Sequence, residues 1–437
     1  MTFAAAKDFL LRRARERDVE AEVLATSQRE LALAANDGRI DEINHASRGG
    51  VGLRVVSDGR VGYASSEALD TDSLEWMLDE AIENAELQTA HGALLPEGRA
   101  LGRHDVIGEG LSSSVEVKAA AAVALERALR ADPRVDALAF ARYGESESEA
   151  VLGSTRGADG GYRTGYSMLV AMPVMKQGDS IKQGWDLDLA REFHALDPSR
   201  TSQTILERVG RHLGATPLRT GRHPALLEPE VTATILQLLL VSLSGKNVAE
   251  GKSRLARRLG ERVASEHITL VDDPTLPTGL GSRPFDAEGT PAQRTALIEA
   301  GVLRSFLHNS DTARRTGQQN TGHAARSYAS TLGISISNLL LEPGTGVALD
   351  DGVIVTDLMG VHAGANPISG DVSVQGYGLL VEAGEARPVD NFAVSFNLFR
   401  LLEQVQAVGD DITWRPAGGG IVGAVSLQVD ALSFAGT

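Results

Sequence analysis

The stretch VGLRVVSDGRVGYAS, residues 51–65, carries the strongest local signal for a fold in this sequence. Two runs of alternating character, residues 51–56 and 60–65, flank the turn Ser57-Asp58-Gly59. Asp-Gly is favoured in tight β-hairpins because the central turn positions need a positive φ. The stretch therefore predicts two antiparallel strands joined by a short turn.

The segment after this hairpin predicts a helix over residues 70–86, and Asp72 or Ser73 is suited to cap its N-terminus. Its apolar residues recur at helical spacing and form one stripe, made of Leu74, Met77, Leu78, Ala81, Ile82 and Ala85. A similar mixture of helices and strands continues to residue 213. We expect further helices at residues 3–17, 114–131 and 201–213, and strands at 21–26, 30–35, 135–141, 149–153 and 162–174.

Strand and turn patterns dominate the second half of the sequence. The basic stretch 214–224, which contains Gly and Pro, is the candidate domain boundary. One helix, residues 229–243, is apolar on nearly every side, which predicts burial. Hairpin-like pairs are expected around Ala300-Gly301, at 382–385 and in the final segment 421–434.

These patterns predict an α+β fold with two domains. The N-terminal α+β domain, with hairpins and helices, covers residues 1–220, and a division of it into 1–105 and 106–220 is an alternative. The β-rich C-terminal domain, with one buried helix, covers residues 221–437.

The composition excludes several functions. There is no cysteine among the 437 residues, which excludes disulfides, thiolate metal ligands and thiol nucleophiles. The net charge is 42 − 58 = −16, and this sign repels a phosphate backbone, so we expect no direct nucleic-acid binding. Two arginine-rich patches, residues 12–17 and 254–262, are interpreted as solvated helix faces.

The sequence gives no membrane or export signal. The longest strongly apolar stretch, residues 235–243, is far shorter than the ~20 residues that span a bilayer. The N-terminus lacks the order of a secretory signal, which is basic first and then apolar. We expect a cytoplasmic protein with no membrane partner.

No local catalytic motif is present. No two of the ten histidines lie three, four or five residues apart, so a local zinc motif is absent. The Gly-x-Ser-x-Gly elbow of serine hydrolases is also absent, and Ser167 is interpreted as a strand residue. The glycine run 418–420 and the stretch 244–247 are interpreted as turns, because neither has the pattern of a phosphate-binding loop.

Two polar positions are candidates for binding. His323 lies in the polar loop 317–324, between a predicted short helix and a strand, and it either braces this loop or contacts a ligand. Asp371 precedes a predicted strand over residues 372–380, and it either forms an Asx-turn or takes part in binding.

Several of these stretches together resemble the TldD/PmbA family, also called the modulator-of-gyrase or peptidase U62 family. The matching stretches are Gly52-Leu53-Arg54-Val55, Gly62-Tyr63-Ala64, Pro284-Phe285-Asp286-Ala287-Glu288-Gly289, 301–307, 310–314, Thr321-Gly322-His323-Ala324, 357–360 and Ile368-Ser369-Gly370-Asp371. The resemblance covers most of the chain and is loosest over residues 90–220. Within the family, the chain resembles the PmbA (TldE) branch.

The resemblance implies a subunit without a catalytic centre. TldD-type subunits carry His-Glu-x-x-x-His on a buried helix, and the corresponding positions of helix 229–243 are Leu236, Gln237 and Val241. Leu and Val cannot bind zinc, and Gln cannot act as a general base. Because the downstream family cysteine is absent too, the isolated chain is expected to be inactive, with no cofactor of its own.

The resemblance further implies that the chain pairs with a zinc-bearing TldD-like subunit in a cytoplasmic metallopeptidase heterodimer. Such an assembly degrades or processes unfolded peptides, among them antitoxins and precursors of modified peptides. Asp286, Thr321, Gly322, His323 and Asp371 would contact the substrate or the partner. The alternatives are a homodimeric peptide-binding or chaperone-like protein without protease activity, and a gyrase-related role through a protein partner.

Overall fold

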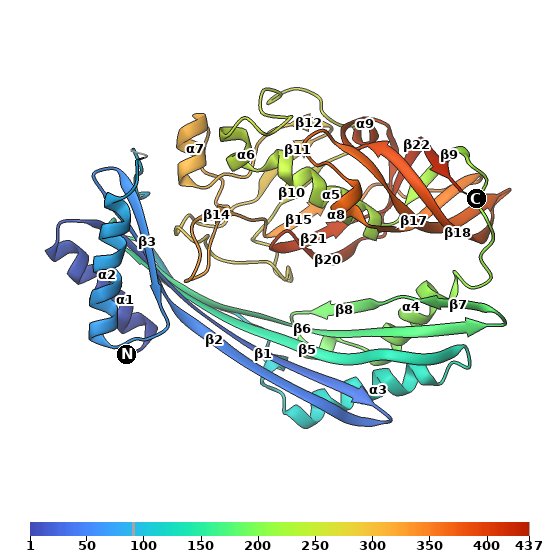
Figure 1. Ribbon diagram of the computed structural model, residues 1–437, viewed down its shortest axis with the longest axis horizontal. Coiled ribbons are helices and arrows are strands. Elements are labelled where there is room, and N and C mark those ends of the chain that lie inside the picture. Colours follow the sequence, from blue (N-terminus) through green and yellow to red (C-terminus); the bar gives the residue numbers. More distant parts are fainter. Residues whose placement is uncertain (90–91, 437) are drawn as a thin grey trace.

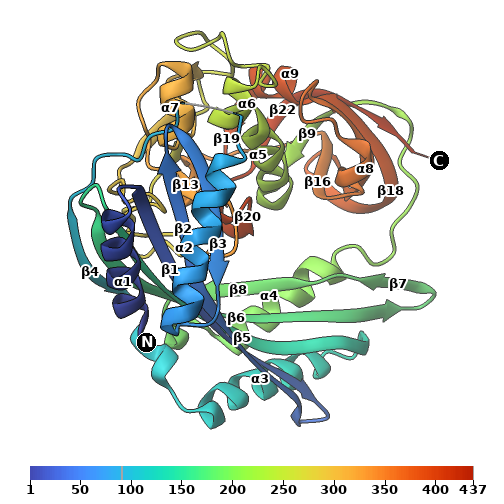
Figure 2. The ribbon, with the colours of Figure 1, turned by 60° about the vertical axis from the view of Figure 1, so that its left-hand side comes forward.

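A long, curved sheet runs through the first half of the chain, and helices cover one of its faces (Figures 1 and 2). The computed structural model describes residues 1–89 and 92–436. The strands of this sheet are β1 (Glu20–Asn36), β2 (Arg39–Ser57), β3 (Arg60–Ser66), β4 (Ala100–Val106), β5 (Val135–Ser154), β6 (Asp159–Gln177), β7 (Ser180–Gln183) and β8 (Asp186–Ala190). Their order is β3-β2-β1-β5-β6-β4, and β7 and β8 pair with other parts of β6.

The hairpin predicted for residues 51–65 is confirmed. β2 and β3 pair antiparallel, with Ser57 opposite Arg60, and Asp58 and Gly59 have φ values of 50° and 72°. β1 and β5 are longer than predicted, because each joins two expected short strands into one. Neighbouring strands pair with β1 on both sides, so their hydrogen bonds keep its polar middle, residues 27–29, in strand geometry.

The predicted helices of this half are present as α1 (Phe3–Glu16), α2 (Thr71–Glu86), α3 (Val115–Arg130) and α4 (Pro198–Gly210), with short 3-10 turns at Glu109–Ser112 and Phe193–Ala195. The predicted cap of α2 is wrong. The carboxylate of Asp70 accepts the N–H of Ser73 at 2.9 Å, because a cap precedes the first helical residue and Asp72 already lies inside the helix.

The two faces of the curved sheet have different partners. Successive side chains of a strand point to opposite faces. Val23 and Leu33 of β1 therefore pack beneath the helices, whereas Glu22 and Leu24 point to the other face. Leu24 lies in a small cluster with Phe285 of the second half, so this inner face of the sheet meets the rest of the chain.

The second half contains a barrel-like sheet, a second sheet and a buried helix. The barrel-like sheet consists of β9 (Gly221–Leu227), β16 (Gly352–Met359), β17 (Asp371–Glu382), β18 (Glu385–Asn397), β19 (Val405–Val408) and β22 (Leu427–Ala435). The second sheet consists of β10 (Leu270–Asp272), β11 (Thr295–Glu299), β12 (Val302–Leu303), β15 (Asn338–Leu341), β20 (Thr413–Ala417) and β21 (Gly420–Ala424). The remaining elements are β13 (Ala324–Ala325), β14 (Gly333–Ile334), α5 (Pro229–Leu243), α6 (Gly245–Ala249), α7 (Ser310–Thr316), α8 (Val361–Gly364) and α9 (Leu398–Glu403).

The order of the barrel-like sheet is β18-β17-β16-β9-β22-β19, and an additional pairing of β18 with β22 closes it. α5 begins and ends at the predicted residues and contributes Ile235, Leu239 and Leu243 to the large core of this half. Together with the long sheet and the helices of the first half, these sheets confirm the predicted α+β class. Residues 211–220 lead from α4 to β9, and the predicted domain boundary at residue 220 stays a prediction.

Several local predictions for this half are confirmed and others are wrong. Hairpins occur at Ala300-Gly301 and at Ala383-Gly384, where both residues of each pair have a positive φ. The hairpin expected over 421–434 is absent: β21 and β22 lie in different sheets, and Asp411 binds the linking residue Ser426. Residues 244–247 begin the short helix α6 instead of forming a simple turn, and the basic patch 254–262 lies in a loop. Among the described helices, none is both long and apolar enough to span a bilayer.

Candidate functional site

The three motif positions on α5 have different surroundings. Leu236 is buried in the core, Gln237 is exposed, and Val241 is half-buried. Their side chains offer no imidazole, thiolate or carboxylate to a metal. Within residues 1–89 and 92–436, no three His, Cys, Asp or Glu side chains gather in a group that could hold a metal ion. His91 lies outside the described residues.

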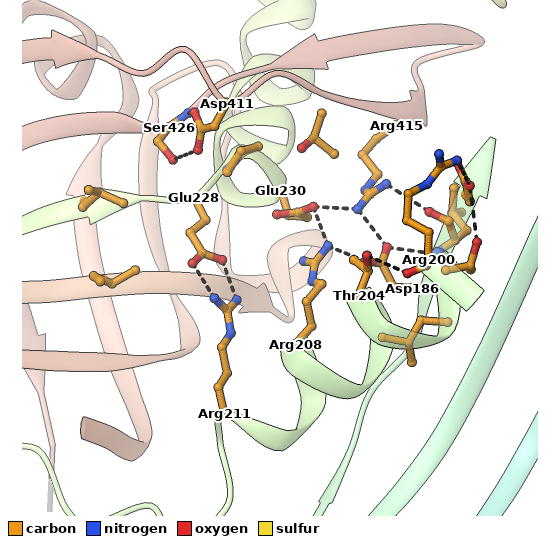
Figure 3. Close-up of a pocket in the computed structure, with 18 of the residues that line it drawn as sticks. Asp186, Arg200, Thr204, Arg208, Arg211, Glu228, Glu230, Asp411, Arg415 and Ser426 are labelled. Carbon is orange, nitrogen blue, oxygen red and sulfur yellow. Dashed lines mark hydrogen bonds and ion pairs between the residues drawn. The ribbon is translucent and has the colours of Figure 1, made fainter. Parts of the chain in front are cut away.

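A pocket of about 530 Å³ lies at the N-terminal end of α5, between the two halves of the chain (Figure 3). Its walls come from β8 and α4 of the first half and from β9, the start of α5 and β20 of the second half. Glu228 precedes the helix and Glu230 lies in its first turn, a position where the helix dipole favours a carboxylate. Charged side chains from both halves of the chain therefore meet in this pocket.

Two arginines in the pocket share the same two carboxylates. Arg208 binds Asp186 at 2.9 Å and Glu230 at 2.5 Å, and Arg415 binds the same two residues at 2.8 Å and 2.6 Å. We call Asp186, Arg208, Glu230 and Arg415 the pocket cluster. Burial alone would raise the pKa of Glu230, but the two arginines outweigh it and lower that pKa below its usual value. The cluster is electrically balanced and connects α4 and β8 with α5 and β20.

A second group of charges lies on the inner face of the long sheet. Arg54 of β2 binds Glu288 at 2.6 Å and lies 3.8 Å from Glu22 of β1, and Arg326 binds Glu22 at 2.8 Å. We call Glu22, Arg54, Glu288 and Arg326 the sheet cluster. Glu288 also accepts the backbone N–H of Ser310 at 2.9 Å. This cluster therefore joins the first half to two segments of the second half. One is the loop between β10 and β11, which contains Glu288, and the other follows β13 and contains Arg326.

Asp286, a predicted contact residue, is buried beside the sheet cluster. Its carboxylate accepts the backbone N–H groups of Glu288 at 2.9 Å, Thr290 at 2.8 Å and Ala324 at 3.0 Å. Burial and the nearby Glu288 raise the pKa of Asp286 to about 7. The side chain thus fixes the loop 286–290 and ties it to the segment that contains His323.

His323 is also buried, and both of its ring nitrogens have partners. Nδ1 lies 2.8 Å from Thr321 Oγ1, and Nε2 lies 3.0 Å from Asp272 Oδ2. Asp272 also accepts the N–H of Ser337 at 2.9 Å, and Gly322 has a φ of 74°. Bracing of the loop accounts for these bonds. Contact of Thr321, Gly322 and His323 with a substrate stays a prediction.

Asp371 shares no hydrogen bond with these loop residues in the described part of the chain. It is the exposed first residue of β17, and its carboxylate accepts the hydroxyl of Ser369 at 2.9 Å and the amide of Asn397 at 2.8 Å. Asn366, and not Asp371, makes the Asx-type contacts, to the N–H groups of Ile368 and Ser369. A binding role of Asp371 stays a prediction.

Neither charge cluster can be recognised as a unit from the sequence. Arg54 and Glu288 lie inside stretches that carry the family resemblance, and Arg54 interrupts an apolar strand, which is a detectable signal of a buried charge. The pocket cluster gives a weaker signal. Its residues come from four distant segments, and only Glu230, just after a proline at a helix start, has a recognisable local position.

Domain comparisons cover most of the chain. Residues 21–85 match the PmbA/TldA metallopeptidase domain 1, residues 109–213 match the central domain, and residues 220–436 match the C-terminal domain of the same family. Among curated relatives, the chain is 26% identical over 405 residues to the metalloprotease PmbA of Escherichia coli O157:H7, covering 90% of this chain and 88% of that one. It is 26% identical over 421 residues to a PmbA homologue of Haemophilus influenzae, covering 94% and 92%.

Solved structures give the same picture. A candidate modulator of a DNA gyrase from Thermotoga maritima MSB8 is 28% identical, with a TM-score of 0.87 and coverage of 99% of this chain and 100% of that one. TldE from Thermococcus kodakarensis has a TM-score of 0.88 over 98% of this chain and 100% of its own, and at 23% identity this likeness concerns the fold.

Proposed function

The chain belongs to the PmbA/TldD metallopeptidase family, and we propose that it is the metal-free, PmbA-like subunit of a cytoplasmic zinc metallopeptidase that degrades or processes unfolded peptides. In this role it supplies part of the enclosing wall and no catalytic group. A zinc-bearing TldD-like relative supplies the metal and the general base.

The observation that carries this proposal is the state of α5. The helix spans Pro229–Leu243 and packs against strands of both sheets, and the positions that correspond to the family's His-Glu-x-x-x-His are Leu236, Gln237 and Val241. A neutral carboxamide such as Gln237 cannot accept a proton from a zinc-bound water at neutral pH, and the two aliphatic side chains have no lone pair for zinc.

Reconstitution tests the proposal. The purified chain should contain no stoichiometric zinc by elemental analysis and should cleave no unfolded peptide. Addition of a zinc-bearing relative from the same host should produce a one-to-one complex and peptide cleavage. Zinc at one equivalent in the isolated chain, together with cleavage, would overturn the proposal.

Matched substitutions show which subunit does the chemistry. Gln237→Ala in this chain should leave the activity of the complex unchanged, whereas replacement of the relative's motif glutamate by glutamine should abolish it. If the tagged chain returns from its host with only further copies of itself, the homodimeric peptide-binding alternative becomes the better explanation. A salt-insensitive complex with gyrase would be needed to support a gyrase-related role.

A further inference from the structure

The pocket at the start of α5 has an apolar floor on the outside of the barrel-like sheet. Leu226 of β9 and Ile354 of β16 both line the pocket and are partners in the parallel pairing of these strands. Ala225 and Leu227, the neighbours of Leu226 along β9, belong to the core, so the side chain of Leu226 points out of the barrel. Val347 lines the pocket too, and like Leu226 and Ile354 it is only half-buried. The floor is therefore apolar surface that remains in contact with solvent.

The four arginines that line this pocket already have carboxylate partners. Arg208 and Arg415 belong to the pocket cluster. Arg211 binds the two carboxylate oxygens of Glu228 at 2.6 Å each, and Arg200 binds Asp188 at 2.9 Å. An anionic ligand would therefore have to separate an arginine from its carboxylate, which leaves that carboxylate without compensation. The lining is poorly suited to an anion.

One carboxylate of the lining, that of Asp411, forms no ion pair with any residue that the structure describes. Its two oxygens accept the backbone N–H of Ser426 at 2.8 Å and the hydroxyl of Ser426 at 2.6 Å. These two bonds fix the carboxylate, and each of its oxygens can accept a further hydrogen bond. Figure 3 shows Asp411 and Ser426 on the opposite side of the pocket from Arg208 and Arg211. The lining thus has one negative charge that a cationic ligand can neutralise.

We propose that this pocket binds the basic side chain, lysine or arginine, of an unfolded peptide. The hydrocarbon stem of that side chain lies on the floor formed by Leu226, Val347 and Ile354, and its charged end binds the carboxylate of Asp411. Lysine and arginine place their stems on apolar surface and keep their charged ends close to water, and this pocket offers both environments. Its volume of about 530 Å³ is that of a typical ligand pocket.

The role of this anchor in a peptidase complex rests on the function proposed above, which supplies the peptide. Pro229 and Glu230, in the first turn of α5, line the same pocket, and Gln237 lies about two turns, or about 10 Å, further along the helix. An extended peptide advances about 3.3 Å per residue, so about three residues cover this distance. The pocket holds one residue of the peptide and leaves the choice of the cleaved bond to the partner subunit.

Equilibrium binding to the purified chain alone tests the anchor. The probes are fluorescein-labelled peptides built of glycine and serine, in which one central position is lysine, norleucine or glutamate, and fluorescence anisotropy measures their affinities. Norleucine has the same stem as lysine but no charge. The lysine peptide should bind about fivefold more tightly than the norleucine peptide, because it adds one partly exposed ion pair. The glutamate peptide should bind more weakly than both.

Matched variants show which side chain supplies the charge. Asp411→Asn removes the charge but can keep both bonds to Ser426, because an amide has an acceptor and a donor. It should lower the affinity for the lysine peptide to that for the norleucine peptide and leave the norleucine peptide unaffected. Asp410→Asn makes the same change at the exposed neighbouring residue outside the lining and should alter none of the affinities. Ile354→Thr, on the floor, should weaken the lysine and norleucine peptides equally.

Thermal unfolding checks that the variants are folded. Equal affinities for the lysine and norleucine peptides, or equal effects of Asp411→Asn and Asp410→Asn on the lysine peptide, would overturn the proposal. Binding of 1,4-diaminobutane without binding of the lysine peptide would assign the pocket to a free amine and would overturn it as well. These measurements use neither zinc nor a partner subunit. Failure of the anchor is therefore distinct from failure of the proposed function, which appears as absent cleavage in the reconstituted complex.

Discussion

The sheet cluster and the pocket cluster have the same composition, two arginines and two carboxylates, and both join the first half of the chain to the second. They differ in contact with solvent. The side chains of the sheet cluster are 0–3% exposed, whereas those of the pocket cluster are 5–24% exposed. The balance of burial and attraction differs accordingly. Burial raises the pKa of Glu22 in the sheet cluster despite its arginines, whereas the arginines lower the pKa of Glu230 in the pocket cluster.

Solvent access therefore decides what each cluster contributes. In the sheet cluster, Glu22 Oε2 and the Nε atoms of Arg54 and Arg326 have no hydrogen-bond partner among the described residues. Removing one partner there leaves an opposite charge buried without compensation. In the pocket cluster, water can reach and solvate a charge that loses its partner, so the same change costs less.

The largest effect is expected from Arg54→Met. The substitution keeps most of the side-chain volume but leaves Glu288 and Glu22 with one arginine between them. We expect the free energy of unfolding to fall by about 3–5 kcal/mol, the usual cost of breaking a buried ion pair. Urea unfolding measures it, with Arg48→Met, an exposed arginine on the same face of the same strand, as the control. A loss below about 1 kcal/mol would contradict the contrast between the clusters.

The next largest effect is expected where Gly52 of β2 contacts the backbone of Tyr328. A Cβ on Gly52 would overlap the backbone oxygen of Tyr328, which lies against β2. Because that neighbour is backbone and cannot rotate away, Gly52→Ala should lower the free energy of unfolding by about 1–3 kcal/mol. Gly333→Ala is the matched control, since a Cβ there meets only ordinary contacts. Equal stability of the two variants in urea unfolding would show that the sheet and this segment separate easily.

The local elements could be predicted from the sequence because their signals are local. Asp58-Gly59 indicated the hairpin, the spacing of apolar residues indicated α2, and an apolar run on nearly every side indicated the buried helix α5. The junction of β21 and β22 could not be predicted, because the partners of both strands lie elsewhere in the chain. The helix predicted for residues 254–262 is wrong for a related reason. The arginines have helical spacing, but the burial of Leu255 and Val263 holds the segment against the core as a loop.

The site was harder to predict than the fold. Arg54 and Glu288 each lie in a recognisable stretch, but they are 234 residues apart, and no local pattern says that they meet. The pocket cluster has the same difficulty, since Arg415 and Asp186 are separated by 229 residues. Asp286 and His323 lie in separate stretches of the family resemblance, and the structure joins these stretches through the hydrogen bond from the Ala324 N–H to Asp286.

A smaller effect is expected from Arg415→Met in the pocket cluster. Arg208 remains in place and still binds both Asp186 and Glu230, so one excess negative charge is left near solvent. We expect a loss of about 1 kcal/mol, decreasing further in high salt because ions screen partly exposed charges. Unfolding measured at low and high salt tests this, with Arg54→Met as the reference that salt should barely change. A salt-independent loss as large as that of Arg54→Met would remove the distinction between the two clusters.

The last effect is absent at neutral pH and appears only as the pH changes, with opposite signs for His212 and for Asp286. Burial, together with Arg211 and Lys182, lowers the pKa of His212 to about 4, from 6.5. The folded chain therefore keeps this ring neutral, and the stability it contributes is full above pH 6.5 and lost as the pH falls toward 4. His212→Gln can keep the hydrogen bond to Thr356 Oγ1 and should flatten the loss of stability between these pH values.

His308, whose pKa burial also lowers to about 4, retains its own part of this acid dependence in the His212→Gln variant. Asp286, beside the sheet cluster, acts in the opposite direction: its raised pKa means that stability is lost as the pH rises from 3.8 to about 7. His212→Gln should therefore change only the acid side of the stability profile, measured by urea unfolding at a series of pH values. His194→Gln, which alters an exposed ring, serves as the control. An equal flattening by both variants would mean that His212 has no special part in this acid dependence.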